Sequence, residues 1–222
     1  MIQLAAFLGN PGGAYTRNRH NAGRLLAETL PFFASLNWQE KFKGRYAALD
    51  RDRIAAFAAP GGTASLAAAP QDKVYFLLPE TFMNLSGESV QPAAAWFKIP
   101  PERILVVHDE LELPLGTASL KFSGGLGGHN GLRSIKASFG TAGFWRLRIG
   151  IGRPGDRIPG RGGPPGSGRG IVDWVLSDFS PPEEEVLASA LDACAAALIR
   201  ALAYGPETLL PEWGKKRAVQ EP

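Results

Sequence analysis

Residues 4–23, LAAFLGNPGGAYTRNRHNAG, decide the fold: they begin as an apolar run and then break sharply. The break is Gly9-Asn10-Pro11-Gly12-Gly13, where glycine permits positive φ and proline fixes φ at about −65°. This pattern predicts a buried strand that ends in a tight loop. Several polar side chains then precede a helical pattern: Tyr15, Arg17, Arg19, His20 and Asn21. Because ligands bind at such strand-to-helix junctions in α/β sheets, His20 is the first candidate for chemistry.

Strand-like and helix-like segments alternate along the rest of the chain. Residues 74–78 (VYFLL) and 103–107 (RILVV) are continuous apolar runs, typical of strands buried on both faces. Residues 145–151 alternate apolar and basic side chains, which also predicts a strand. Helical spacing is found in residues 24–33, 86–97, 132–139 and 181–204, the last after the capping box Ser180-Pro-Pro-Glu183. The fold class that we predict is α/β, a single domain with a mixed, twisted central sheet flanked by helices.

Other segments are predicted to be turns or loops. Residues 46–49 and 54–58 flank Asp50-Arg51-Asp52-Arg53 and are interpreted as a hairpin. Residues 60–71 and the Gly/Pro/Arg-rich residues 153–170 are expected to form long loops. The domain is expected to cover residues 1–205 and to be followed by a C-terminal tail, residues 206–222, that is frayed from residue 209 onward.

Composition limits the classes of function. Of the 222 residues, 45% are hydrophobic and 20% charged, as in an ordinary globular protein. The net charge of +3 is too small to indicate nucleic-acid binding by itself. Cys194 is the sole cysteine, which excludes an internal disulfide and a thiolate metal cluster and suits a reducing cytoplasm. We expect neither a signal peptide nor a membrane span, because residues 1–9 lack basic residues and no run approaches about 18 apolar residues.

Polar residues follow three predicted strands, in residues 10–20, 82–84 and 108–110, and His129-Asn130 follows a glycine-rich turn. The set contains a base candidate, His20, a carboxylate that could orient it, Asp109, and three carboxamides. There is no G-x-S-x-G nucleophile motif, and Cys194 lies on an apolar helix face. A histidine without a nucleophile partner suggests a general base that activates water.

Structural roles remain open for each of these residues. His20 could be a structural donor, Asp109 a turn residue, and Asn130 or Asn84 a helix N-cap. Phe82 and Met83 are core residues by default. The glycine turn 124–131 could bind phosphate or only allow two backbones to approach. His20, His108 and His129 could form a zinc site, although no HxH or HxxxH spacing supports one.

Five blocks in order make the combination specific. They are LGNPGGAYTRNRHNAG (8–23), LPETFMNLSGESV (78–90), VVHDELELPLG (106–116), GGLGGHNGLRSI (124–135) and FWRLRIGIGRPG (144–155). Together they resemble the bacterial-type peptidyl-tRNA hydrolases from about residue 3 to residue 155, with a looser continuation through residues 172–202. The resemblance implies a monomeric, cytoplasmic α/β enzyme that needs no metal or cofactor. Its substrate would be peptidyl-tRNA, cleaved at the ester between the peptide and the 3′-terminal ribose.

The resemblance also implies roles for single residues. His20 would be the base, Asp109 the partner that stabilises its protonated form, and Asn10 the residue that senses the acylated amino group. The residues implied to bind substrate or the tRNA end are Tyr15, Phe82, Met83, Asn84 and Asn130. Lys121 and Arg146 would meet tRNA phosphates. Residues 60–71 and 156–170 depart from the family pattern but carry no motif residue. The main rival, a non-catalytic RNA-binding protein on the same fold, would not need His20 and Asp109.

Overall fold

An eight-stranded sheet forms the centre of the computed structural model, which describes residues 1–58, 72–156, 170–214 and 217–218. The strands are β1 (Leu4–Phe7), β2 (Gln39–Lys41), β3 (Gly44–Asp50), β4 (Lys73–Pro79), β5 (Ile104–Glu110), β6 (Thr117–Phe122), β7 (Trp145–Gly150) and β8 (Arg217–Ala218). Their order is β2-β3-β4-β1-β5-β7-β6-β8. The central strands β4, β1, β5 and β7 are parallel, and the outer strands pair antiparallel. The predicted mixed sheet is confirmed.

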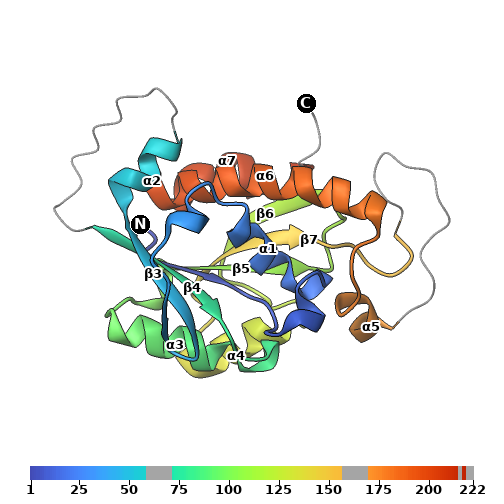
Figure 1. The fold of residues 1–222 in the computed structure, drawn as a ribbon, viewed down its shortest axis with the longest axis horizontal. Coiled ribbons are helices and arrows are strands. Elements are labelled where there is room, and N and C mark those ends of the chain that lie inside the picture. Colours follow the sequence, from blue (N-terminus) through green and yellow to red (C-terminus); the bar gives the residue numbers. More distant parts are fainter. Residues whose placement is uncertain (59–71, 157–169, 215–216, 219–222) are drawn as a thin grey trace.

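Helices cover both faces of the sheet (Figure 1). On one face lie α1 (Ala22–Glu28), α2 (Arg51–Ala58) and α6 (Pro181–Tyr204), and on the other lie α3 (Gly87–Trp96) and α4 (Asn130–Phe139). Strand β1 shows why its sequence is apolar throughout: Ala5 and Phe7 enter the first core, and Leu4 and Ala6 enter the second. Burial on both faces leaves no position for a polar side chain.

Helix α6 begins and ends where its sequence predicts. The Glu183 carboxylate accepts a hydrogen bond of 2.7 Å from the Ser180 N–H, and Gly205 ends the helix at φ 97°. By length and composition alone, the helix could cross a membrane. Two thirds of that apolar window, 67%, is buried inside the protein. This burial is what a core helix requires.

The predicted hairpin around residues 50–53 is wrong, because residues 51–58 form α2. The Arg51 side chain is buried: it pairs with Asp72 at 2.6 Å and donates to the carbonyl oxygen of Ile2 at 2.7 Å. These partners are distant in the sequence, so the local pattern could not reveal them.

The prediction that the tail is frayed is also wrong for residues 209–213, which are part of an ordered segment that starts at residue 206. This segment forms η6 (Pro206–Leu209) and α7 (Leu210–Trp213), and Leu209 and Trp213 are buried in the core. The long loops expected at 60–71 and 153–170 lie mostly outside the described residues. Helix α5 (Ile171–Val175) follows the second of them.

Candidate active site

The site lies where the carboxyl ends of the parallel strands meet. Strand β1 leads to Asn10, β4 leads to the 3₁₀ helix η4 (Met83–Leu85), and β5 ends in His108-Asp109-Glu110. The carboxyl ends of parallel strands are at the same edge of a sheet, so these residues converge although they are far apart in sequence. The 3₁₀ helix η2 (Arg19–Asn21) adds His20 to them.

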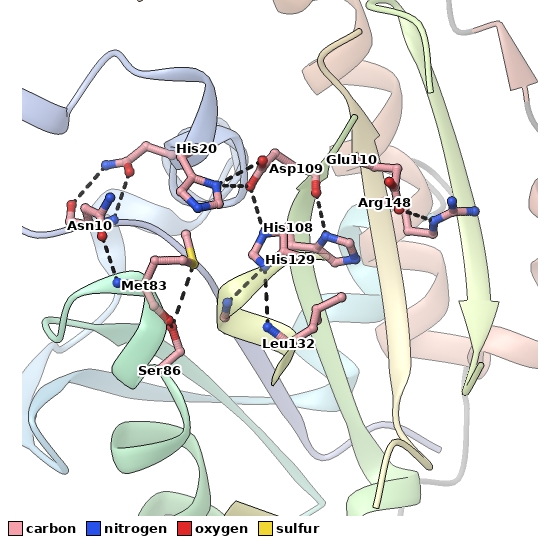
Figure 2. A network of polar contacts seen from close by, with 12 residues as sticks. Asn10, His20, Met83, Ser86, His108, Asp109, Glu110, His129, Leu132 and Arg148 are labelled. Carbon is pink, nitrogen blue, oxygen red and sulfur yellow. Dashed lines mark hydrogen bonds and ion pairs between the residues drawn. The ribbon is translucent and has the colours of Figure 1, made fainter. Parts of the chain in front are cut away.

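His20 and Asp109 form a hydrogen-bonded pair (Figure 2). His20 Nδ1 lies 2.9 Å from Asp109 Oδ1 and 3.0 Å from Oδ2, and both residues are buried. A carboxylate accepts, so the proton of a neutral His20 lies on Nδ1 and the lone pair on Nε2. Nε2 makes no hydrogen bond to any residue that the structure describes. The carboxylate thus orients the His20 ring so that the Nε2 lone pair is not used by the described residues.

The charge of Asp109 sets the protonation of His20. Burial by itself would lower the pKa of His20, but the negative charge and hydrogen bond of Asp109 outweigh it and raise the pKa above the ordinary value. Burial would likewise raise the pKa of Asp109, yet His20 and His129 hold it far below its ordinary range. Asp109 therefore stays ionised while His20 titrates.

A second histidine, His129, also contacts Asp109. Its Nε2 lies 2.9 Å from Asp109 Oδ1, and its ring centre is 4.9 Å from that of His20. His129 is the N-cap of α4, and its Nδ1 accepts from the N–H groups of Gly131 (3.1 Å) and Leu132 (3.4 Å). The alternative that Asn130 is the N-cap is wrong. The sequence indicated His129 only as a ligand of the alternative zinc site, and its capping role was not expected because histidine is not among the preferred N-caps.

Asn10 is fixed by its neighbours. Its backbone N–H donates to Asn21 Oδ1 at 2.8 Å, and Asn21 Nδ2 donates back to the Asn10 carbonyl at 3.0 Å. Its side-chain Oδ1 accepts from the Met83 N–H at 2.7 Å (Figure 2). The amide group of Asn10 consequently has one orientation, with its NH₂ group turned away from η4.

A cleft of about 310 Å³ opens beside His20, Asp109 and His129. His20, Asp109, His129 and Asn130 line one part of it. The N-terminal turn of α5 adds an apolar wall, in which Ile171 and Val172 are 51% and 67% exposed. The cleft thus places an apolar surface next to a base.

Other candidate residues belong to, or directly precede, the 3₁₀ helices η1 (Gly13–Tyr15) and η4. The rings of Tyr15 and Phe82 pack edge to face at 6.5 Å, and Asn84 is exposed on η4. Asn10 borders a separate hollow of about 300 Å³ together with Asn21 and Arg24. The Met83 side chain is buried in the core on the side of α3 and α4, and its backbone N–H donates to Asn10 Oδ1.

Lys121 and Arg146 are paired neighbours on β6 and β7. Lys121 is exposed, but Arg146 is buried, and its Nη1 donates to the Gly125 carbonyl at 2.7 Å. Arg146 Nε and Nη2 have no partner among the described residues. Burial beneath the glycine turn means that Arg146 can contact a phosphate directly only if that turn moves.

Arg19 fixes η2, the segment that carries His20, through contacts that the sequence did not reveal. Its guanidinium contacts both carboxylate oxygens of Glu183, at 2.8 and 2.6 Å, and lies 3.8 Å from the ring centre of Trp174. It also donates to Ser177 Oγ at 2.8 Å. Since Arg19 precedes His20, these contacts join η2 to α5 and to the start of α6.

The predicted alternative of three histidines as zinc ligands is not the set that the structure assembles. Ligand atoms of His20, Asp109 and His129 lie within 4.8 Å of one another, whereas His108 Nδ1 lies 2.6 Å from the carbonyl oxygen of Asp109. These ligand atoms are already joined by hydrogen bonds, because Asp109 accepts from both histidines. A cation could use them only if those bonds were broken.

The chemistry that this geometry allows is proton abstraction from water at a carbonyl or ester bound in the cleft. Nε2 can take the proton, and Asp109 stabilises the imidazolium that results. Carboxamide N–H groups nearby can stabilise an oxyanion.

Comparisons with known proteins agree with one another. The family model of peptidyl-tRNA hydrolases matches residues 4–220. The chain is 43% identical over 219 residues to the peptidyl-tRNA hydrolase of Treponema pallidum, and the alignment covers 97% of this chain and 96% of that protein. It is 43% identical over 194 residues to the enzyme of the same name from Haemophilus influenzae, covering 86% and 85%. The crystal structure of peptidyl-tRNA hydrolase from Acinetobacter baumannii matches with a TM-score of 0.70 at 34% identity, covering 93% of this chain and 91% of that one. The chain therefore belongs to the peptidyl-tRNA hydrolase family.

Proposed function

We propose that the protein hydrolyses the ester between the peptide and the 3′-terminal ribose of peptidyl-tRNA, with His20 as a general base and without a metal ion. The observation that carries this proposal is the pair of contacts from His20 Nδ1 to Asp109, at 2.9 and 3.0 Å, beside the cleft. It leaves Nε2 available to a water molecule.

The reaction then proceeds in two proton transfers. His20 Nε2 takes a proton from water as the oxygen attacks the ester carbonyl carbon, and the carbonyl oxygen becomes an oxyanion. The imidazolium is stabilised by the ionised Asp109. When the tetrahedral intermediate collapses, the same proton passes to the departing ribose 3′ oxygen. The products are a free peptide carboxyl group and tRNA, and His20 returns to its neutral form.

Selection of N-blocked substrates is assigned to Asn10. Its side-chain Oδ1 accepts from the Met83 N–H, and its backbone exchanges hydrogen bonds with the Asn21 side chain, so it presents a fixed NH₂ group. This donor suits the carbonyl oxygen of a peptide bond but leaves the ammonium of a free aminoacyl group badly paired.

The remaining family residues are assigned to the tRNA end and its phosphates. Asn130 lines the cleft, Tyr15 packs against the exposed Phe82, and Asn84 is exposed on η4; we assign all four to contact with the acceptor end. Lys121, with Arg146 beneath the glycine turn, would meet phosphates. We place the enzyme in the cytoplasm as a monomer, where peptidyl-tRNA is formed.

A hydrolysis assay that compares N-acetylated with free aminoacyl-tRNA, with and without EDTA, tests the proposal. We expect fast release of tRNA from the N-acetylated substrate, little from the free one, and the same rates in EDTA. Loss of activity in EDTA, restored by a divalent cation, would favour a metal-dependent esterase. Binding of tRNA without turnover would favour the non-catalytic RNA-binding protein.

A further inference from the structure

Asp109 accepts hydrogen bonds from two histidines at once, and only one of them lies where a base is needed. Oδ1 is 2.9 Å from His20 Nδ1 and 2.9 Å from His129 Nε2 (Figure 2). The reaction proposed above uses His20 and Asp109 and leaves His129 without a role. The side chain of His129 is nevertheless almost fully buried, with 7% of its surface exposed.

The hydrogen bonds of His129 define its protonation. Nδ1 accepts from the N–H groups of Gly131 and Leu132 at the start of α4, so this nitrogen carries no proton. The proton of the ring must then be on Nε2, which faces the carboxylate. His129 is held as a neutral donor, and one side chain links the cap of α4 to the partner of the base.

We propose that His129 is a positioning residue, whose N–H bond to Asp109 shares the charge of that carboxylate and whose cap on α4 fixes Asn130. The inference deepens the proposed function and rests on it. His129 touches neither the water nor the ester: it acts on His20 through Asp109, and on substrate binding through the first turn of α4.

The other charged groups around the pair leave this arrangement intact. Glu110, on the same strand, pairs with Arg148 of β7 at 3.0 Å. His108 is buried, and this burial holds its pKa well below the ordinary value. The positive charge of Arg146 also opposes protonation of His108. Within the described residues, the Asp109 carboxylate thus has His20 and His129 as its hydrogen-bonding side chains.

Two substitutions separate the two bonds of His129. In His129→Asn, the short amide reaches the position of Nδ1 and is a preferred N-cap, but it cannot reach Asp109. In His129→Gln, the longer amide can donate to Asp109 in place of Nε2, but glutamine is a poor N-cap. Each variant is the matched control for the other.

The two variants should change different quantities: the pH dependence of kcat/KM in His129→Asn, and KM in His129→Gln. In His129→Asn the whole charge of Asp109 acts on His20, so imidazolium is favoured and the acidic limb of kcat/KM moves to higher pH. The expected shift is about one pH unit, the size of one hydrogen bond to a charged group, with KM within about twofold of wild type. In His129→Gln the limb should remain in place, while KM rises about fivefold because the first turn of α4 frays.

The pH dependence of kcat/KM for N-acetyl-aminoacyl-tRNA, measured for wild type and both variants, gives these quantities. NMR titration of the His20 ring in the substrate-free proteins gives the same shift without any assay of activity, and thermal unfolding shows that each variant is folded. If wild type hydrolyses no substrate, the proposed function fails, and the NMR titration still decides the effect of His129 on His20. A His129→Asn titration that overlays wild type, or moves to lower pH, would overturn the inference, as would equal KM values for the two variants.

Discussion

Asp109 carries its charge with almost no exposure to solvent, because His20 and His129 both donate to it. An isolated buried carboxylate would be protonated, whereas a hydrogen-bonded one next to imidazoles stays ionised. Only the neutral form of His20 can accept a proton from water, so the rate should rise with pH through the raised pKa of His20.

Asp109→Asn should shift the acidic limb of kcat/KM in the direction opposite to the shift expected for His129→Asn. The variant keeps a similar shape but removes the charge that favours imidazolium, so the acidic limb of kcat/KM moves to lower pH. The plateau should fall by about 10²-fold or more, because the imidazolium formed in the transition state loses its partner. A pH–rate profile measures both effects.

Asp192→Asn is the matched control, because it removes the same charge from an exposed position on α6. Its profile should overlay wild type. An Asp109→Asn variant with an unmoved limb and an intact plateau would remove Asp109 from the mechanism.

Among single residues, the sequence predicted those that carry a chemical signal. His20, Asp109 and Asn10 follow predicted strands, and strand ends meet at one edge of the sheet, so their proximity could be expected. The hydrogen bond from His129 to Asp109 could not be expected, because it depends on how the start of α4 packs against the end of β5. The burial of Arg146 was also hidden, since an alternating strand pattern does not tell which face is covered.

At the scale of elements, the position of His20 depends on the start of α6. Glu183 accepts from Ser180 as part of the capping box and pairs with the buried Arg19, the neighbour of His20. One carboxylate therefore fixes both the start of α6 and the segment η2 that carries His20.

Substituting Glu183 with glutamine should destabilise the protein through that pair. Glutamine can preserve the capping box, but it leaves the buried guanidinium of Arg19 without a counter-charge, at a cost of about 3 kcal/mol. Chemical unfolding measures the loss. Glu184→Gln, which breaks the exposed pair with Arg17, should cost much less. Equal losses for the two variants would contradict the role assigned to Arg19.

Elements with continuous apolar runs or clear caps were predicted well, and those fixed by distant contacts were not. β4, β5 and α6 are examples of the first kind. Helix α2 is of the second kind: Asp50-Arg51-Asp52-Arg53 has the composition of a turn, but Arg51 is drawn into the core by Asp72 and by backbone carbonyl oxygens. Residues 206–213 are similar, because the core that accepts Trp213 is built by other strands.

At the scale of the whole molecule, the net charge of +3 is too small to attract a polyanion over long distances. Salt dependence must then come from local contacts with phosphates. Each such contact adds about one unit or less to the slope of log(kcat/KM) against log salt concentration.

Lys121→Ala should make that slope shallower by about one unit or less. Lys73→Ala is the matched control: it removes the same exposed charge at the start of β4, the opposite end of the parallel strands from the site. A salt titration of kcat/KM compares them. The same slope for both variants would mean that Lys121 meets no phosphate.

The central claim, that His20 is the base for hydrolysis of peptidyl-tRNA, is tested most directly by single-turnover cleavage of N-acetyl-aminoacyl-tRNA by His20→Ala in the presence of EDTA. The rate should fall by about 10²–10⁴-fold, while the dissociation constant for tRNA, measured in parallel, stays close to that of wild type. A variant that binds tRNA normally and keeps a tenth or more of the wild-type rate would contradict the assignment.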